Sequence, residues 1–372
     1  MRSVSVGLML CLSMGFGHVG AAMAAGTPAD GKVPYTGSQF DIYALSMPDV
    51  AYLVSYVGQE REGRINTDGS TDSNRGFVPG STPLFVETQK VGYQVLRAGL
   101  AANNSLWIDK GLRAIEWGLK PEVLGADGSF PDQRETETLA GRALHPKSIF
   151  LDSAAHAVLL IRQSDTPAAY KARAELLVPG IHLAVREIVD SGDAFRFFKN
   201  NANSSQLAFV AMAIHQAGLV AGDQFLIDVA RKQFEQIFAM QMTNGAFLEK
   251  GGFDTSYQMN TLELTTAYNA TLEAGDWRNK VAARNKMAAD WFLGRVAENG
   301  SVDTTGNTRQ EACSSLPGYF PKGLDIDNIP IRLYHHAYLA GRTKVIAPVA
   351  AQIQFRGTTY DHFGHCANPV VQ

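Results

Sequence analysis

The chain has 372 residues, of which 45% are hydrophobic and 19% are charged, and its formal net charge is −3 at pH 7. This composition is ordinary for a folded globular protein. No block of Lys and Arg residues occurs, so nucleic acid is not expected as a partner.

The first 24 residues have the parts of a secretory signal peptide. Arg2 supplies a positive charge, the stretch 4–25 is apolar, and Ala22-Met23-Ala24 fits the small-x-small cleavage pattern. We therefore expect residues 1–24 to be removed and the mature protein to be periplasmic or secreted. No later stretch is long and apolar enough to predict a membrane span.

Two cysteines, Cys313 and Cys366, remain once Cys11 leaves with the signal. In an oxidising compartment, such an even pair predicts a disulfide. A metal site built from His362, His365 and Cys366 is the alternative, because thiolate and imidazole suit zinc. We favour the disulfide and expect no metal and no cofactor.

Residues 25–84 are predicted to be an N-terminal extension and a loop, because turn-forming and polar residues dominate them. From Phe85 onward, apolar residues recur at spacings of three and four, which is typical of α-helices. The predicted helices are 85–101, 103–119, 148–163, 167–191, 203–218, 222–242, 257–274, 276–297 and 328–342. Alternating β patterns are scarce, so residues 85–372 are predicted to form an all-α domain with few strands.

Three joints between predicted helices share one pattern, an Asx-Gly pair followed by a small residue and an apolar residue. They are Asp127-Gly128-Ser129-Phe130, Asn244-Gly245-Ala246-Phe247 and Asn299-Gly300-Ser301-Val302. The joints are 117 and 55 positions apart, near two helix hairpins and one hairpin. This spacing favours an α/α toroid, an incomplete barrel of helix hairpins. An irregular helical array with coincidental turns is the alternative.

One polar cluster lies within residues 244–258, where a predicted helix begins near Tyr257. Its polar members are Glu249, Lys250, Asp254, Tyr257 and Gln258. Charged and aromatic groups that converge on a loop favour a binding site. A polar turn that merely caps a helix is the alternative.

A second polar cluster runs from Lys199 to Gln206. Asn200 and Asn201 can donate hydrogen bonds to a carboxylate without adding a charge. Ordinary helix capping is again the alternative, but three Asn, two Ser and one Gln exceed what one cap needs.

Three further residues are candidates on chemical grounds. His156 and His215 lie on apolar helices, where a satisfied core histidine is the alternative to a catalytic base. Arg309 follows the third joint, and the fork of its guanidinium group matches two carboxylate oxygens.

Two of these motifs resemble elements of secreted α/α-toroid polysaccharide lyases, the alginate lyase-like and heparinase-like group. Lys199-Asn200-Asn201 before a helix resembles the Asn-Asn element of alginate lyases, with Ala202 where a His is usual. Asn244-Gly245-Ala246-Phe247, followed by Tyr257, resembles the Asp-Gly-Ser-Phe stretch and downstream Tyr of several such lyases. The resemblance implies β-elimination on an acidic polysaccharide that contains uronic acid.

Such a reaction must neutralise the substrate carboxylate, remove the neighbouring proton and protonate the leaving oxygen. The carboxylate-binding role falls to amide and guanidinium donors, and the proton-transfer role to a Tyr or His. The expected catalytic residues are Tyr257, Asn201, His156 and His215, and the expected substrate-binding residues are Asn200, Lys250, Asp254, Gln258 and Arg309.

Two other functions compete with the lyase. A toroid glycoside hydrolase would use paired carboxylates, with Glu249 or Asp254 facing Asp152 or Asp303. A glycan-binding protein without catalysis would instead stack sugars on aromatic side chains. Its candidate aromatics are Trp107, Trp117, Phe253 and Tyr257.

Overall fold

The computed structural model describes residues 61–130, 144–295, 303 and 305–308. Of these residues, 68% are helical, in nine α-helices and two short 3-10 helices, and none lies in a β-strand. The predicted all-α class is therefore confirmed for this part of the chain.

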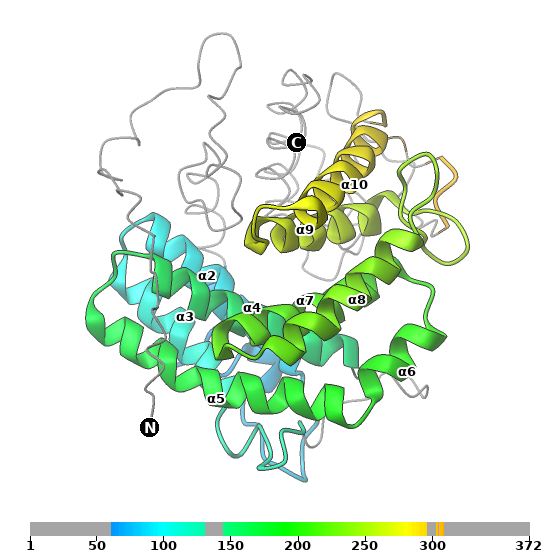
Figure 1. Ribbon diagram of the computed structural model, residues 1–372. Coiled ribbons are helices and arrows are strands. Elements are labelled where there is room, and N and C mark those ends of the chain that lie inside the picture. Colours follow the sequence, from blue (N-terminus) through cyan, green and yellow to red (C-terminus); the bar gives the residue numbers. More distant parts are fainter. Residues whose placement is uncertain (1–60, 131–143, 296–302, 304, 309–372) are drawn as a thin grey trace, which may run out of the picture.

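The helices begin and end within a few residues of their predicted bounds (Figure 1). They are α2 (Val91–Ala101), α3 (Ser105–Gly118), α4 (Leu144–Gln163), α5 (Ala168–Asp190), α6 (Asp193–Asn200), α7 (Ser204–Ala221), α8 (Gln224–Ala239), α9 (Thr255–Thr271) and α10 (Asp276–Leu293). The 3-10 helices are η4 (Asp72–Asn74) and η5 (Val86–Lys90), and η5 runs directly into α2.

One helix, α6, was not predicted. It is only eight residues long, and Gly192 with a φ of +78° separates it from α5. A segment this short gives too few turns for periodicity to be recognised. The predicted helix 328–342, Arg309, Cys313, Cys366 and the third Asx-Gly joint all lie outside the described residues.

Helix hairpins follow one another along the chain, as α2–α3, α4–α5, α7–α8 and α9–α10. The first helices of the hairpins also pack side by side, α2 on α4, α4 on α7 and α7 on α9. Near their starts, the rings of His145 on α4 and Phe209 on α7 are in contact, and farther along His156 bonds Gln216. The helices α4 and α7 are therefore parallel, and their N-termini lie at the same end.

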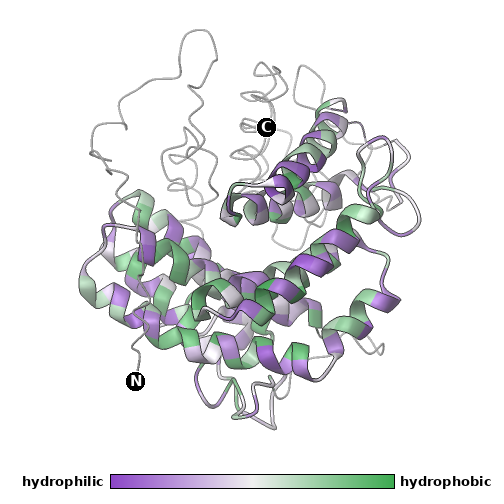
Figure 2. Ribbon diagram, in the orientation of Figure 1, coloured by the Kyte–Doolittle hydropathy of each residue, from purple (hydrophilic) through white to green (hydrophobic). Residues whose placement is uncertain are grey.

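The core is one large cluster of buried apolar side chains to which all four hairpins contribute. Figure 2 shows hydrophobic and hydrophilic bands along α5 and α8, as expected of helices with one buried face. The helix α7 instead carries no Asp, Glu, Lys or Arg, and it is long and apolar enough by composition to cross a membrane, but 78% of that stretch is buried. Packing of α7 against α4, α8 and α9 accounts for this composition.

Residues 61–84 pack onto the first hairpin. Ile65 is buried with Val91 and Val95 of α2 and Ala114 of α3. Lys110 on α3 forms an ion pair with Glu62 at 2.7 Å. The packing of the hairpin domain therefore continues on both sides of the predicted boundary at residue 85.

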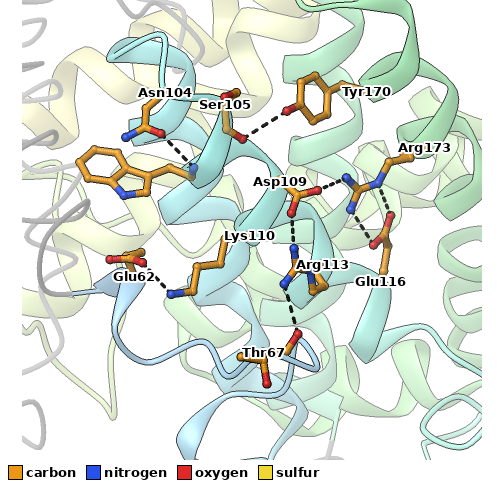
Figure 3. Close-up of polar contacts among 11 residues, drawn as sticks. Glu62, Thr67, Asn104, Ser105, Asp109, Lys110, Arg113, Glu116, Tyr170 and Arg173 are labelled. Carbon is orange, nitrogen blue, oxygen red and sulfur yellow. Dashed lines mark hydrogen bonds and ion pairs between the residues drawn. The ribbon is translucent and has the colours of Figure 1, made fainter.

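An ion-pair network joins the second helices of the first two hairpins (Figure 3). Arg173 on α5 donates to both carboxylate oxygens of Glu116 at 2.8 Å and also bonds Asp109, which Arg113 reaches along α3. Burial raises the pKa of Asp109, but the hydrogen bonds and charges of the two arginines outweigh it and hold the pKa below its usual value. The network fixes α3 against α5.

Three turns have the same hydrogen bonds, and each precedes a hairpin. The side chain of the Asp or Asn accepts a 3.0 Å bond from the amide two residues later, and the glycine between them has a positive φ. The three turns are Asp68-Gly69-Ser70, Asp127-Gly128-Ser129 and Asn244-Gly245-Ala246. The second and third are the predicted joints, whereas the first was not recognised.

Each of these turns rests on the second helix of the hairpin that follows it. A Cβ atom on Gly69, Gly128 or Gly245 would lie 2.5, 2.6 or 2.3 Å from a carbonyl oxygen of α3, α5 or α10, respectively. Buried glutamines reinforce the first and third turns: Gln89 bonds Gly69 and α3, and Gln258 bonds Gly245 and α10. The hairpins are thus structural repeats that share one packing device.

We expect Gly245→Ala to destabilise the fold by roughly 3 kcal/mol, because it combines a left-handed backbone with a collision against α10. Gly222→Ala is the matched control. Gly222 also has a positive φ, of +67°, but a Cβ there would meet nothing within 4 Å, so about 1 kcal/mol is expected. Urea unfolding of both variants gives the measurement. Equal losses would contradict the seating of Gly245 on α10.

Candidate functional site

The loop before α9 folds back onto the start of α7. The amide of Ser204 donates to the carbonyl oxygen of Leu248 at 3.0 Å, and the amide of Ser205 donates to Glu249 Oε1 at 2.6 Å. Glu249 is fully buried and so caps the N-terminus of α7 from a distance of 44 residues in sequence. The N-terminal ends of α7 and α9 are therefore held together.

The start of α9 is built from its own cap and from residues near position 307. Asp254 caps the helix by accepting a 3.1 Å bond from the amide of Tyr257. Asn307 accepts from the amide of Thr255 at 3.1 Å, and the Thr308 hydroxyl donates to the carbonyl oxygen of Glu249 at 3.0 Å. These contacts leave Tyr257 half-buried in the first turn of α9.

Three side-chain amides form a connected group at the start of α7, which we call the amide cluster: Asn201, Asn203 and Gln206. Gln206 Oε1 accepts from Asn201 Nδ2 at 2.8 Å and from Asn203 Nδ2 at 3.3 Å. Asn201 Oδ1 accepts from the amide of Asn203 at 2.8 Å, and Asn203 Oδ1 accepts from the amide of Lys250 at 3.1 Å. The cluster therefore ties the end of α6 to the loop before α9.

The structure brings several of the predicted site residues to this one end. Asn201, Lys250 and Tyr257 are connected through Asn203 and the loop before α9, and the side chain of Lys250 is exposed. Lys250 has a φ of +50°, a left-handed conformation that favours Gly or Asn. Asn200 is exposed at the last residue of α6, whereas Arg309 lies outside the described residues.

Two predicted substrate-binding residues are engaged in the fold. Gln258 is fully buried; its Oε1 accepts from the amide of Phe247 at 2.7 Å and its Nε2 donates to Gly245 and Ala288 carbonyls. Asp254 is 2% exposed and caps α9. Both side chains hold the site in place and are not available to bind a substrate.

His156 lies in a buried polar chain on α4. Gln216 Nε2 donates to His156 Nε2 at 2.8 Å, so the neutral ring carries its proton on Nδ1, which lies 3.1 Å from Asp152 Oδ1. The ring of Tyr93 stacks on the imidazole at 5.7 Å. In this arrangement the Nε2 lone pair of His156 is occupied. Asp152, one of the candidate hydrolase carboxylates, is buried beside Nδ1 of the same ring.

His215 is 1% exposed and lies on α7, beyond the middle of the helix. The Thr271 hydroxyl donates to the Tyr268 carbonyl oxygen at 2.7 Å, so Thr271 Oγ1 accepts the 2.7 Å bond from His215 Nε2. Burial, and then the charge of nearby His156, lowers the pKa of His215 to about 3. A neutral core histidine accounts for this environment.

Sequence reasoning missed Asn203 and Gln206 as individual site residues, although both belong to the polar run that begins at Lys199. The count of three Asn, two Ser and one Gln marks this run as polar, but only the folded structure shows which amides bond one another. Asn307 and Thr308 were missed as well, because their partners lie more than fifty residues away in sequence.

No protein-family model, no curated protein and no solved structure matches the chain. The candidate site is therefore defined by its own residues, and its two parts are the amide cluster at the start of α7 and Tyr257 at the start of α9.

Proposed function

We propose that this chain is an exported polysaccharide lyase that cleaves an acidic, uronic acid-containing polysaccharide by β-elimination. The proposal includes closure of the hairpins into an α/α toroid, removal of residues 1–24, and a disulfide between Cys313 and Cys366. The side-by-side packing of α2, α4, α7 and α9 supports the toroid, because a toroid has such a row of inner helices.

One observation carries the proposal: a donor-rich amide cluster and a half-buried Tyr are held at the same end of adjacent helices. Amide donors stabilise the negative charge that develops when a proton beside a carboxylate is removed. Asn201 has this role, with Asn200 and Arg309 as further donors. Tyr257 is the proposed group that removes the proton and then protonates the leaving oxygen.

The positions of the carboxylates favour a lyase over a hydrolase. A hydrolase needs two carboxyl groups that face the scissile bond, one as acid and one as base or nucleophile. Glu249 and Asp254 are both buried, and each uses one carboxylate oxygen to accept from an amide at the start of α7 or α9. Neither side chain presents a carboxylate to a sugar.

Incubation of the mature protein with a panel of acidic polysaccharides tests the proposal. A lyase produces unsaturated sugars that absorb ultraviolet light, together with new reducing ends. We expect both signals to rise together on at least one uronic acid polymer. Reducing ends without absorbance would show a hydrolase, and binding with neither signal would show a glycan-binding protein, so either result contradicts the proposal.

A further inference from the structure

The orientation of every amide in the amide cluster is fixed by two backbone N–H groups. A backbone N–H only donates, so Asn201 must turn its Oδ1 to the amide of Asn203, and Asn203 must turn its Oδ1 to the amide of Lys250. The Nδ2 groups of both asparagines then donate to one acceptor, which has to be Gln206 Oε1.

In this arrangement all three side-chain oxygens accept hydrogen bonds within the cluster or from the backbone, and several side-chain N–H groups remain available to a ligand. The two N–H bonds of Gln206 Nε2 meet no acceptor among the residues that the structure describes, and each asparagine Nδ2 has a second N–H beyond the one it gives to Gln206. The three side chains are all partly exposed. A surface that offers N–H groups but no acceptor suits a ligand that carries acceptor oxygens.

The surroundings add positive charge. Lys199 lies two residues before Asn201, Lys250 donates its amide to Asn203, and both lysine side chains are exposed. The nearest acid in the same loop, Glu249, is buried against the amide of Ser205. An anionic oxygen group is therefore favoured over a neutral one.

The cluster also marks the point where the hairpin repeat is broken. Asn201 accepts from the amide two residues later, as do the Asp and Asn of the three packing turns, but Ala202 replaces their glycine. This segment has no glycine at that position, and it bonds to the loop before α9. Where the other hairpins have a packing turn, the hairpin α7–α8 therefore has a partly exposed set of amides.

We propose that Gln206 is a specificity-determining residue whose Nε2 group binds the carboxylate of a uronic acid unit, with the asparagines fixing its orientation. The assignment rests on the proposed function for the kind of ligand. It adds a residue and a role, namely discrimination of acidic from neutral sugar.

Gln206→Glu is the sharpest variant. A Glu side chain keeps an oxygen to accept from Asn201 and Asn203, but it removes both outward N–H donors and adds a negative charge. Gln163→Glu is the matched control, because Gln163 is exposed at the last residue of α4, at the opposite end of the parallel helices.

The probes are tetramannuronate, tetragalacturonate and the same oligosaccharides after reduction of their carboxyl groups, titrated calorimetrically into Tyr257→Phe protein to prevent cleavage. The Tyr257→Phe protein with Gln206 intact should bind an acidic oligosaccharide at least about tenfold more tightly than the same oligosaccharide with reduced carboxyl groups. Gln206→Glu should abolish this preference by weakening only the acidic form, and Gln163→Glu should retain it.

Three results would overturn the assignment. The first is no preference for the acidic oligosaccharide while Gln206 is intact, and the second is an unchanged preference in Gln206→Glu. The third is an equal loss of affinity for the acidic and the neutral oligosaccharide, which would mean that Gln206 only supports the segment. The proposed function fails separately. If the wild type cleaves no polymer but Gln206→Glu abolishes its acidic preference, the lyase is refuted and Gln206 stays assigned. Cleavage with an unaltered KM in Gln206→Glu would refute Gln206 and leave the lyase.

Discussion

Tyr257→Phe should lower the rate of polysaccharide cleavage by about 10²–10⁴-fold, the contribution typical of a general acid–base group. The helix around Tyr257 does not depend on its hydroxyl group, because Asp254 caps α9 through the backbone amide of Tyr257. The ring of Phe keeps the same packing and the backbone cap is retained, so the variant should remain folded and lose at most about 1 kcal/mol of stability with the hydroxyl. Absorbance assays on the substrate of the wild type, together with urea unfolding, measure the two quantities.

Tyr268→Phe supplies the matched control on the same helix. Tyr268 is 1% exposed, accepts a 2.9 Å bond from Trp277 Nε1, and burial raises its pKa to about 12. Removal of its hydroxyl should leave the cleavage rate unchanged and cost about 1 kcal/mol of stability, because Trp277 loses its acceptor. If Tyr257→Phe cleaves at the wild-type rate, the catalytic role of Tyr257 is wrong.

Acid should destabilise this protein through His215. In the unfolded chain this imidazole takes up a proton near its ordinary pKa of 6.5, whereas in the fold its pKa is about 3. Between these values the unfolded state binds more protons, so stability is lost as the pH falls from 6.5 toward 3. At about 1.4 kcal/mol per unit, the loss from this group is roughly 2 kcal/mol at pH 5 and at most roughly 5 kcal/mol near pH 3.

The test compares wild type and His215→Gln by urea unfolding at several pH values from 7 to 4. An amide keeps a donor for Thr271 but does not titrate, so the variant should lose less stability on acidification, whatever its stability at pH 7. The neighbouring Asp152–His156 pair is present in both proteins, so the difference between the profiles reports the titration of His215 together with its charge interaction with His156. Parallel pH profiles would contradict the assigned environment of His215.

Local features of this fold could be predicted from the sequence. The spacing of apolar residues located every described α-helix except α6, because one buried face imposes the helical period over several turns. The Asx-Gly pairs identified two of the three packing turns, because glycine is needed where φ is positive. The first turn, Asp68-Gly69-Ser70, was missed because Thr71 follows it, where the other two turns have Phe.

The roles of the polar residues in the site were decided by the tertiary structure alone. Glu249, Lys250 and Gln258 lie within ten positions of one another in the sequence. In the structure, however, Glu249 caps α7, Gln258 bonds a turn to α10, and only Lys250 of the three has an exposed side chain. The partners that separate these roles lie 30 or more positions away. Helical periodicity predicts which face of a segment is buried. A hydrogen bond between distant segments forms only when the helices pack and bring each backbone N–H group next to an acceptor.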